Sequence, residues 1–255
     1  MPEGDTVWKT AQLQNAALSG AVLTGFDLRV PKFATADLTG ETVHEVISRG
    51  KHLFHRIGEF SLHTHLKMEG AWRTFAPGEA WRRPAFQARA VLTTADVVSV
   101  GFELGTTELL RRDEEESVVG HLGPDLLGAW DPVEAARRLS TSSDPVYVAL
   151  LDQRNLAGIG NVYANELCFL RGVLPTRPMT EVDPVPMVGL AERMLQANKD
   201  RWTRSTTGDL RPGQTSWVYG RRGRPCRRCG TRLLSGELGR DMQERAVTWC
   251  PNCQR

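Results

Sequence analysis

The chain is poor in cysteine and tyrosine, and it has no long apolar run. Of its 255 residues, five are cysteine and three are tyrosine. No stretch approaches the roughly 20 apolar residues of a membrane-spanning helix, so we expect no membrane partner. No signal peptide or other export segment leads into the chain, which predicts a cytoplasmic protein with reduced thiols. Internal repeats and low-complexity tracts are also absent, so a repeat architecture is not expected.

The composition is that of a soluble globular protein, but the charge is unevenly spread. Hydrophobic residues make up 40% of the chain and charged residues 24%, which suits one large domain or two ordinary ones. The net charge is only +2, yet residues 199–255 carry 13 basic and 5 acidic side chains, against 19 and 25 in residues 1–198. Such a basic segment favours a polyanionic partner, because each neutralised phosphate releases condensed counterions. A merely solvated basic surface is the alternative, although five of the arginines surround a cysteine motif: Arg221, Arg222, Arg224, Arg227 and Arg228.

Four of the five cysteines form two pairs near the end of the chain. They are spaced as Cys226-x2-Cys229 and Cys250-x2-Cys253, with twenty residues between the pairs. Two such turns can bring four thiolates together around one tetrahedral zinc ion, and a site with four protein ligands is structural rather than catalytic. Chance clustering and a disulfide pair are the alternatives. The spacing therefore predicts a zinc finger that the metal helps to fold.

The first half of the chain begins with a helix pattern and continues with strand patterns. Residues 3–19 place Val7, Ala11 and Leu18 on one stripe, and Gly20 follows where the helix should end. Short segments rich in Val, Leu, Phe or Thr, separated by glycine, then predict the strands of an antiparallel sandwich. These segments are residues 22–30, 52–57, 60–65, 86–93 and 97–102.

Helix signals return after a boundary that we place at residues 117–131. Asp131-Pro132 offers an N-cap and a first-position proline, and Asp144-Pro145 and Asp183-Pro184 repeat this pattern. The last of these helices should run towards Arg201. We therefore predict a β-sandwich domain over residues 1–120, a helical domain over 131–215 and a zinc-finger hairpin over 216–255.

A glycine-bearing turn between two helix patterns lies at residues 157–160. Gly158 and Gly160 permit tight backbone geometry, and Asn161 stands where the second helix opens with unpaired N–H groups and a positive dipole end. This arrangement can seat a phosphate, although an ordinary helix hairpin with an asparagine cap is the alternative. Cys168 follows among apolar residues, so we interpret it as a buried small hydrophobe rather than a reactive thiol.

The start of the chain offers a nucleophile if Met1 is removed. Pro2 then carries a terminal secondary amine, whose pKa of about 8 lies well below the value of about 10.4 for a lysine. Attack of this amine on a sugar C1′ would give an iminium that makes elimination of the 3′ and 5′ phosphates feasible. Glu3 beside it could serve as acid or base. An ordinary helix start is the alternative interpretation of Pro2 and Glu3.

Five further motifs are spread over the chain. They are the opening PEG, GKHLF at 50–54, LDQ with LAGIGNVYANE, VYGRRGRPCRRCG at 218–230, and the ending ERAVTWCPNCQ. Together these segments resemble the formamidopyrimidine-DNA glycosylase and endonuclease VIII family, essentially from end to end. Gly4-Asp5, HLGPDLL at residues 121–127 and TTGD at 206–209 most resemble actinobacterial endonuclease VIII-like proteins.

The resemblance implies a fold, an activity and roles for single residues. The fold is α+β, with an N-terminal helix and antiparallel β-sandwich, then a helical domain with a helix-two-turn-helix motif and the four-cysteine zinc finger. The enzyme flips a damaged base out of the duplex, cleaves the glycosidic bond and nicks the strand by β,δ-elimination. Pro2 matches the Schiff-base nucleophile and Glu3 the catalytic carboxylate. Lys51, Asn161 and Arg245 match residues that bind backbone phosphates, and Lys51 and Arg245 also count among the catalytic set.

The resemblance also identifies a wedge residue and two departures from the family pattern. Met68 matches the first side chain that fills the space of the extruded base, and a core methionine is the alternative. Residues 101–105 lack the arginine and phenylalanine that complete the wedge in the oxidised-purine branch. Asp5 and Thr6 stand where the family often has proline and glutamate, which shifts or removes one acidic group near the nucleophile.

These matches predict a bacterial, nucleoid-associated repair enzyme that acts as a monomer on damaged double-stranded DNA, with single-stranded DNA as a second candidate partner. We expect it to excise oxidised pyrimidines, because residues 207–217 leave little room for a long loop over an oxidised purine. An enzyme of 8-oxoguanine and formamidopyrimidine lesions is the alternative within the family. A non-catalytic protein that binds damaged DNA through Asn161, Arg245 and the cysteines is the alternative outside it.

Overall fold

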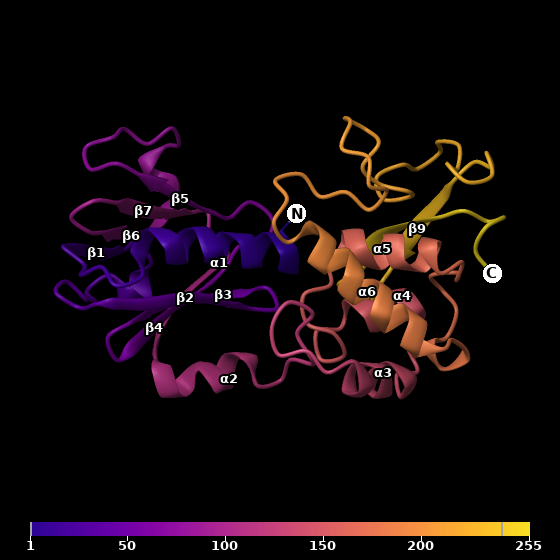
Figure 1. Cartoon of the computed structure of the whole chain (residues 1–255), viewed down its shortest axis with the longest axis horizontal. Helices are drawn as coiled ribbons and strands as arrows, with labels where there is room; N and C mark the ends of the chain where they lie inside the picture. Colours follow the sequence, from indigo (N-terminus) through magenta and orange to yellow (C-terminus); the bar gives the residue numbers. More distant parts are fainter. Residues whose placement is uncertain (1, 241) are drawn as a thin grey trace. The chain divides into compact units, whose positions relative to one another are not determined.

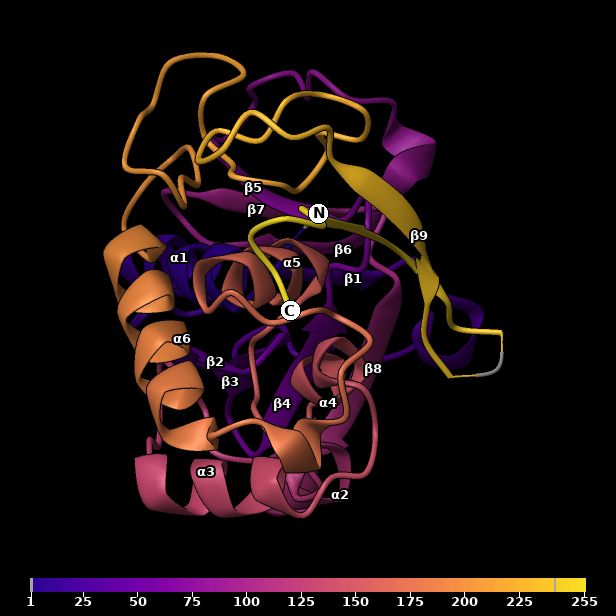
Figure 2. The same ribbon diagram turned by 90° about the vertical axis from the view of Figure 1, so that its right-hand side faces the viewer.

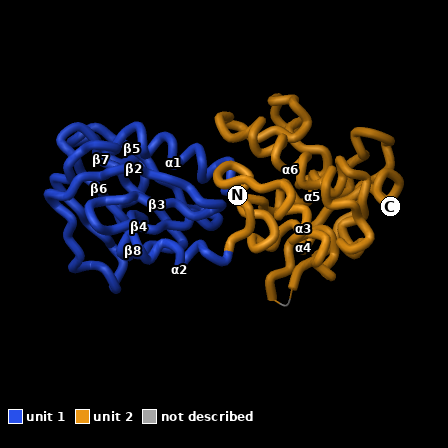
Figure 3. Tube along the Cα trace, turned by 60° about the horizontal axis from the view of Figure 1, so that its bottom comes forward, with its two compact units in different colours: residues 1–121 blue, residues 122–255 orange. Residues whose placement is uncertain are grey.

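The computed structural model describes residues 2–240 and 242–255. The chain folds as two units. One unit comprises residues 1–121 and the other residues 122–255 (Figure 3). The first consists mainly of antiparallel sheets and the second mainly of helices, which confirms the predicted α+β class. A separate third domain over residues 216–255 stays a prediction. None of the described helices is long and apolar enough to cross a bilayer.

The first unit begins with α1 (Gly4–Leu18), which buries the predicted stripe of Val7, Ala11 and Leu18. Glu3 is its N-cap residue, and the backbone turns away from the helix after Ser19 at a glycine with φ of +80°. The helix packs against both sheets of this unit and runs between them in Figure 1. The helix expected over residues 3–19 is thus confirmed.

One sheet of this unit has the strand order β1 (Gly25–Leu28), β6 (Ala88–Thr93), β7 (Val98–Phe102) and β5 (Ala71–Phe75), all paired antiparallel. The second has the order β2 (Val43–Arg49), β3 (His52–Ile57), β4 (Phe60–His65) and β8 (Thr106–Arg111), also antiparallel. Strands β3 and β4 have the predicted bounds, and β1, β6 and β7 lie inside the predicted segments. The remaining short elements are η1 (Pro31–Phe33), η2 (Ala85–Gln87), η3 (Arg112–Glu114) and α2 (Glu115–Val119).

Two helices of the second unit start at predicted caps. The Asp131 side chain accepts hydrogen bonds from two backbone N–H groups at the start of its helix, both at 3.0 Å, and the Asp183 side chain accepts one. At the Asp144-Pro145 signal, the Asp144 side chain does not cap a helix. It forms an ion pair with Arg240 at 2.5 Å. The elements are α3 (Pro132–Ser140), α4 (Val146–Leu151), α5 (Asn161–Leu170), η4 (Met179–Glu181) and α6 (Pro184–Asn198).

The second unit ends in a β-hairpin that packs against the helices of this unit. Strands β9 (Leu234–Leu238) and β10 (Arg245–Trp249) pair antiparallel, and β10 packs against α5 (Figure 2). Val247 is buried in the same apolar cluster as the faces of α4, α5 and α6. The hairpin is therefore part of the helical core rather than an appendage.

A buried carboxylate in α5 holds the chain segment that leads into this hairpin. Glu166 is fully buried, and its oxygens accept hydrogen bonds from the backbone N–H groups of Trp217, Val218 and Tyr219 at 2.7, 2.8 and 2.8 Å. The hydroxyl of Thr206 donates a further, short bond to the same carboxylate. A carboxylate that accepts several N–H bonds is well compensated for its burial.

Glu166→Gln is expected to lower the free energy of unfolding by about 3 kcal/mol, because the amide turns an NH2 group towards backbone donors and about two charge-assisted bonds are lost. Urea unfolding of this variant measures the change. Glu237→Gln, an exposed change in β9, is the control and should leave stability unaltered. Equal stability of the two variants would contradict the anchoring role.

Candidate functional site

The start of α1 holds Pro2 and Glu3 in a defined place. The Glu3 carbonyl oxygen accepts hydrogen bonds from the N–H groups of Thr6 and Val7 at 2.9 and 3.0 Å, and the side chain of Glu3 is fully buried. Glu3 is therefore at the helix end whose dipole favours negative charge. Pro2 is half-buried next to it, and Met1, whose removal would free the amine, lies outside the described residues.

Asp5 supplies a second carboxylate in the first turn of α1. It is 4% exposed, and its Oδ1 accepts hydrogen bonds from the backbone N–H of Thr6 at 2.7 Å and from the Thr6 hydroxyl at 3.3 Å. The departure from the family pattern at positions 5 and 6 thus places an acidic group in the first turn and binds it to its own neighbour.

Lys51 lies in the tight turn between β2 and β3. Gly50 before it has a φ of +58°, a left-handed conformation that glycine adopts without strain. In the pairing of β3 with β4, His52 lies opposite His65. The His65 ring also interacts electrostatically with the positive charges of Lys67 and Lys51. Burial first, and then these two charges, lower the pKa of His65 to about 4, so the ring is neutral at pH 7.

His65 is a candidate site residue that sequence reasoning missed. Its Nδ1 accepts a hydrogen bond from the backbone N–H of Lys67 at 2.9 Å, so the proton of the neutral ring is on Nε2. The neutral ring therefore has one N–H donor, on Nε2, at the strand position opposite His52. Strand register was the missing information, because the sequence alone does not place residue 65 opposite residue 52.

Met68 is exposed and does not belong to the core of its unit. Its side chain is 52% accessible, which contradicts the alternative of a core methionine. The preceding Lys67 has a φ of +52°, and Gly105 approaches the Lys67 side chain so closely that an added Cβ would meet it at 2.0 Å. Segments 66–70 and 101–105 thus lie together. In the second segment Phe102 is fully buried among aromatic rings, so it is not a wedge residue.

Asn161 opens α5 after the predicted glycine turn, in which Gly158 has a φ of +107°. Its side chain is 8% exposed, and its Oδ1 accepts hydrogen bonds from the Tyr147 hydroxyl at 2.6 Å and from Asn165 Nδ2 at 2.7 Å. These bonds direct the amide nitrogen of Asn161 away from Tyr147 and Asn165.

Arg245 is the first residue of β10, where the hairpin loop ends, and it is exposed. Burial raises the pKa of the Tyr147 hydroxyl, and the positive charge of Arg245 opposes part of this rise. The Tyr147 hydroxyl also lies 3.4 Å from the carbonyl oxygen of Ala246. The structure therefore brings Arg245 and Asn161 to the same tyrosine.

Three of the arginines around the cysteine motif bind the protein itself. The Arg221 guanidinium donates to the carbonyl oxygens of Trp217 and Pro225, and that of Arg227 donates to those of Gly213 and Ser216 at 2.6 and 3.0 Å. A third guanidinium, that of residue 228, stacks over the Phe169 ring at 4.6 Å. These contacts hold the guanidinium groups of three of the five arginines in place on the protein.

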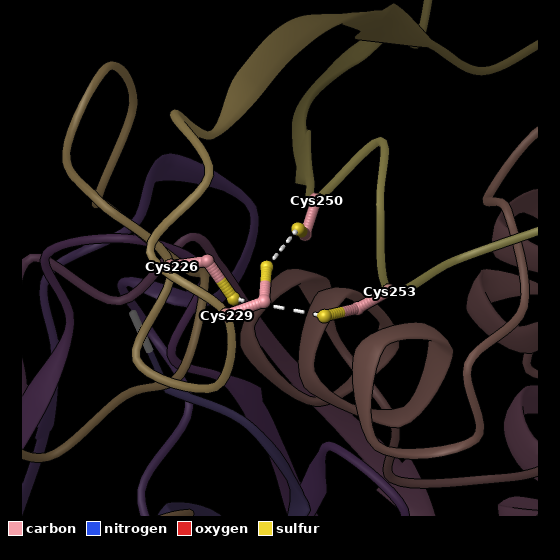
Figure 4. A group of neighbouring side chains, drawn as sticks. All are labelled: Cys226, Cys229, Cys250 and Cys253. Carbon is pink, nitrogen blue, oxygen red and sulfur yellow. Dashed lines mark hydrogen bonds between the residues drawn. The ribbon is translucent and has the colours of Figure 1, made fainter.

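The four paired cysteines form one cluster (Figure 4). Their Sγ atoms all lie within 4.8 Å of one another, with 4.0 Å between Cys226 and Cys253 and 3.5 Å between Cys229 and Cys250. Sulfurs bound to one tetrahedral ion at about 2.3 Å are about 3.8 Å apart, so the cluster can hold a metal ion. Cys168 lies apart in the core, where burial raises its thiol pKa to about 12, as expected for a small hydrophobe.

Comparison with known proteins covers nearly the whole chain. The model of the formamidopyrimidine-DNA glycosylase N-terminal domain matches residues 1–123, and the model of the formamidopyrimidine-DNA glycosylase H2TH domain matches residues 122–196. A curated relative, the "DNA-(apurinic or apyrimidinic site) lyase Nei2" of Mycolicibacterium smegmatis, is 53% identical over 257 residues, which span all of this chain and 99% of the relative. The "Probable endonuclease 8 2" of Streptomyces coelicolor is 52% identical over all of this chain and 94% of its own length.

Solved structures agree on the fold. The complex between Lactococcus lactis Fpg and DNA that contains an abasic site matches with a TM-score of 0.81 over 99% of both chains, at 23% identity. At this identity the likeness concerns the fold alone. Both domain models match the chain, and the two relatives are more than 50% identical to it. The chain therefore belongs to the formamidopyrimidine-DNA glycosylase family.

Proposed function

We propose that this protein is a base-excision-repair DNA glycosylase that also acts as an abasic-site lyase, on damaged double-stranded DNA of the bacterial nucleoid. The observation that carries the proposal is the buried carboxylate of Glu3 beside Pro2 at the start of α1, in a chain of this family. The names of the relatives, an abasic-site lyase and an endonuclease 8, agree with it.

The proposed reaction uses the terminal amine and the carboxylate in sequence. With Met1 removed, the Pro2 nitrogen attacks C1′ of the damaged nucleotide, and the base leaves with the electrons of the glycosidic bond. The Pro2 nitrogen loses its proton, and Glu3 protonates the ring oxygen as the C1′–O4′ bond breaks and the sugar opens to an iminium. A base then removes the C2′ proton, and the electrons of that C–H bond move towards the iminium nitrogen. They return as the C2′=C3′ double bond forms and the C3′–O bond breaks, which releases the 3′ phosphate. Loss of the C4′ proton drives cleavage of the C5′–O bond in the same way and releases the 5′ phosphate. Water hydrolyses the final iminium, which restores the Pro2 amine and releases the sugar as an unsaturated aldehyde.

The remaining site residues are proposed to hold the nucleic acid. Lys51 in the unit of residues 1–121, and Asn161 and Arg245 in the other, bind backbone phosphates, while exposed Met68 fills the space of the extruded base. A zinc ion bound by the four clustered cysteines holds the hairpin that carries Arg245; this metal stabilises structure and takes no part in the chemistry. A monomer is sufficient for this function.

A preference for oxidised pyrimidines is supported by the short loop after α6. The backbone N–H of Thr206 donates to the carbonyl oxygen of Thr215 at 2.8 Å, and the Thr207 hydroxyl donates to that of Gln214 at 2.7 Å. These bonds close the loop at its base, so only residues 208–213 extend beyond it. A loop of this length leaves little chain to cover a bulky oxidised purine.

Borohydride should trap a covalent adduct between an abasic-site oligonucleotide and the protein lacking Met1, because the reagent reduces the iminium at Pro2. The matched control is the same chain with Met1 retained, in which Pro2 forms a tertiary amide and cannot react. Denaturing electrophoresis measures the adduct. Absence of an adduct with the processed protein, under conditions where it binds the oligonucleotide, supports the non-catalytic DNA-binding alternative instead.

A panel of duplexes with one lesion each should show faster excision of 5-hydroxyuracil and thymine glycol than of 8-oxoguanine opposite cytosine. We expect at least a tenfold ratio of single-turnover rates, equivalent to about 1.4 kcal/mol in the transition state. A duplex with a preformed abasic site reports lyase activity that does not depend on the base. Efficient excision of 8-oxoguanine with none of the two pyrimidines would overturn the substrate assignment.

A further inference from the structure

The two ends of the Asn161 amide are not equivalent for DNA binding. Its Nδ2 carries two hydrogen-bond donors, which a phosphate accepts, whereas its Oδ1 is an acceptor that would repel a phosphate. The proposed role of Asn161 therefore requires that Nδ2 faces the DNA. The two ends have nearly the same shape, so only the hydrogen-bond partners of the amide can determine its orientation.

A backbone donor in the hairpin determines the orientation. The N–H of Thr248 in β10 can only donate, and it bonds to the side chain of Asn165 at 2.7 Å, so that atom is Oδ1. The Nδ2 of Asn165 consequently faces Asn161, where it bonds to the backbone oxygen at 2.8 Å and to the side-chain oxygen at 2.7 Å. The Asn161 oxygen thus faces inward and its nitrogen outward.

Tyr147 reinforces the same orientation from α4. Its hydroxyl carries one proton, and the 2.6 Å bond to Asn161 Oδ1 is much shorter than the 3.4 Å separation from the Ala246 carbonyl oxygen. Tyr147 is fully buried and Asn165 is 1% exposed, so neither touches DNA itself. The reversed amide would set its NH2 group against the NH2 group of Asn165, and it would leave the Tyr147 hydroxyl only the distant Ala246 carbonyl oxygen as an acceptor.

We propose that Asn165 and Tyr147 are positioning residues, through which strand β10 of the hairpin turns the Asn161 amide nitrogen towards a DNA phosphate. This inference rests on the proposed phosphate-binding role of Asn161. It makes the folded hairpin necessary for two contacts: Arg245 on its own strand, and Asn161 on α5.

A double-mutant cycle tests the role of Tyr147, with a duplex that carries one tetrahydrofuran abasic-site analogue as the probe. Tyr147→Phe should weaken binding roughly fivefold, or about 1 kcal/mol, in the natural chain and have no effect in the Asn161→Ala background. An equal loss in both backgrounds, or no loss in the natural chain when Asn161→Ala does weaken binding, overturns the inference alone. Unchanged affinity of Asn161→Ala overturns the proposed role of Asn161, and the inference with it.

Asn165→Asp tests the direction of the amide. One carboxylate oxygen still accepts from Thr248, while the other forces Asn161 to turn its NH2 inward, so affinity should fall at least as far as in Asn161→Ala. Thr248→Val is the control, because it keeps the backbone donor, and it should bind like the natural chain. Wild-type affinity of Asn165→Asp contradicts the proposal.

A spectroscopic measurement separates positioning from a loss of stability. The NMR signal of the Asn161 side-chain NH2, identified by its absence in Asn161→Ala, should shift when the duplex is added to the natural chain. In folded Asn165→Asp it should not shift. A shift of the same size in both proteins would show that the amide faces the DNA without help from Asn165.

Discussion

The buried carboxylate of Glu166 holds the segment that joins the helices of the second unit to the cysteine motif. It receives three consecutive backbone N–H groups, those of residues 217–219, and so determines where the chain leaves the helices and enters the cysteine motif. The other face of the same helix carries Asn161 and Asn165, which contact Tyr147 and β10. One short helix therefore locates the start of the metal loop, the returning strand and the proposed phosphate-binding amide.

The proposed chemistry and the proposed DNA binding place different physical demands on the chain. The chemistry needs an amine and a buried carboxylate, and the two residues that lead into α1, Pro2 and Glu3, supply both once Met1 is removed. Binding needs several donors in fixed directions, and the second unit supplies them through buried hydrogen bonds and a cysteine cluster. This division explains why the four cysteines are the clearest signal in the sequence although they take no part in the proposed reaction.

The sequence predicts those parts of the fold that depend on local patterns. The stripe in α1, the caps Asp131 and Asp183, strands β3 and β4 and the cysteine cluster all follow from spacing. Strand β2 escaped prediction because a bulge between Val43 and Glu45 breaks its alternation, and β8 because most of its residues are half-buried. The sequence also does not predict how two side chains are placed. The position of His65 depends on strand register, and the orientation of the Asn161 amide depends on a backbone donor distant in the sequence.

The proposed function requires a metal-held hairpin that organises DNA binding by the second unit. Affinity for the tetrahydrofuran duplex can be measured while zinc is returned to metal-free protein. We expect affinity to be lost with the metal and to recover in step with one zinc per chain, together with thiol protection of the four cysteines. Full affinity in the metal-free protein would show that the hairpin does not need the metal to bind DNA.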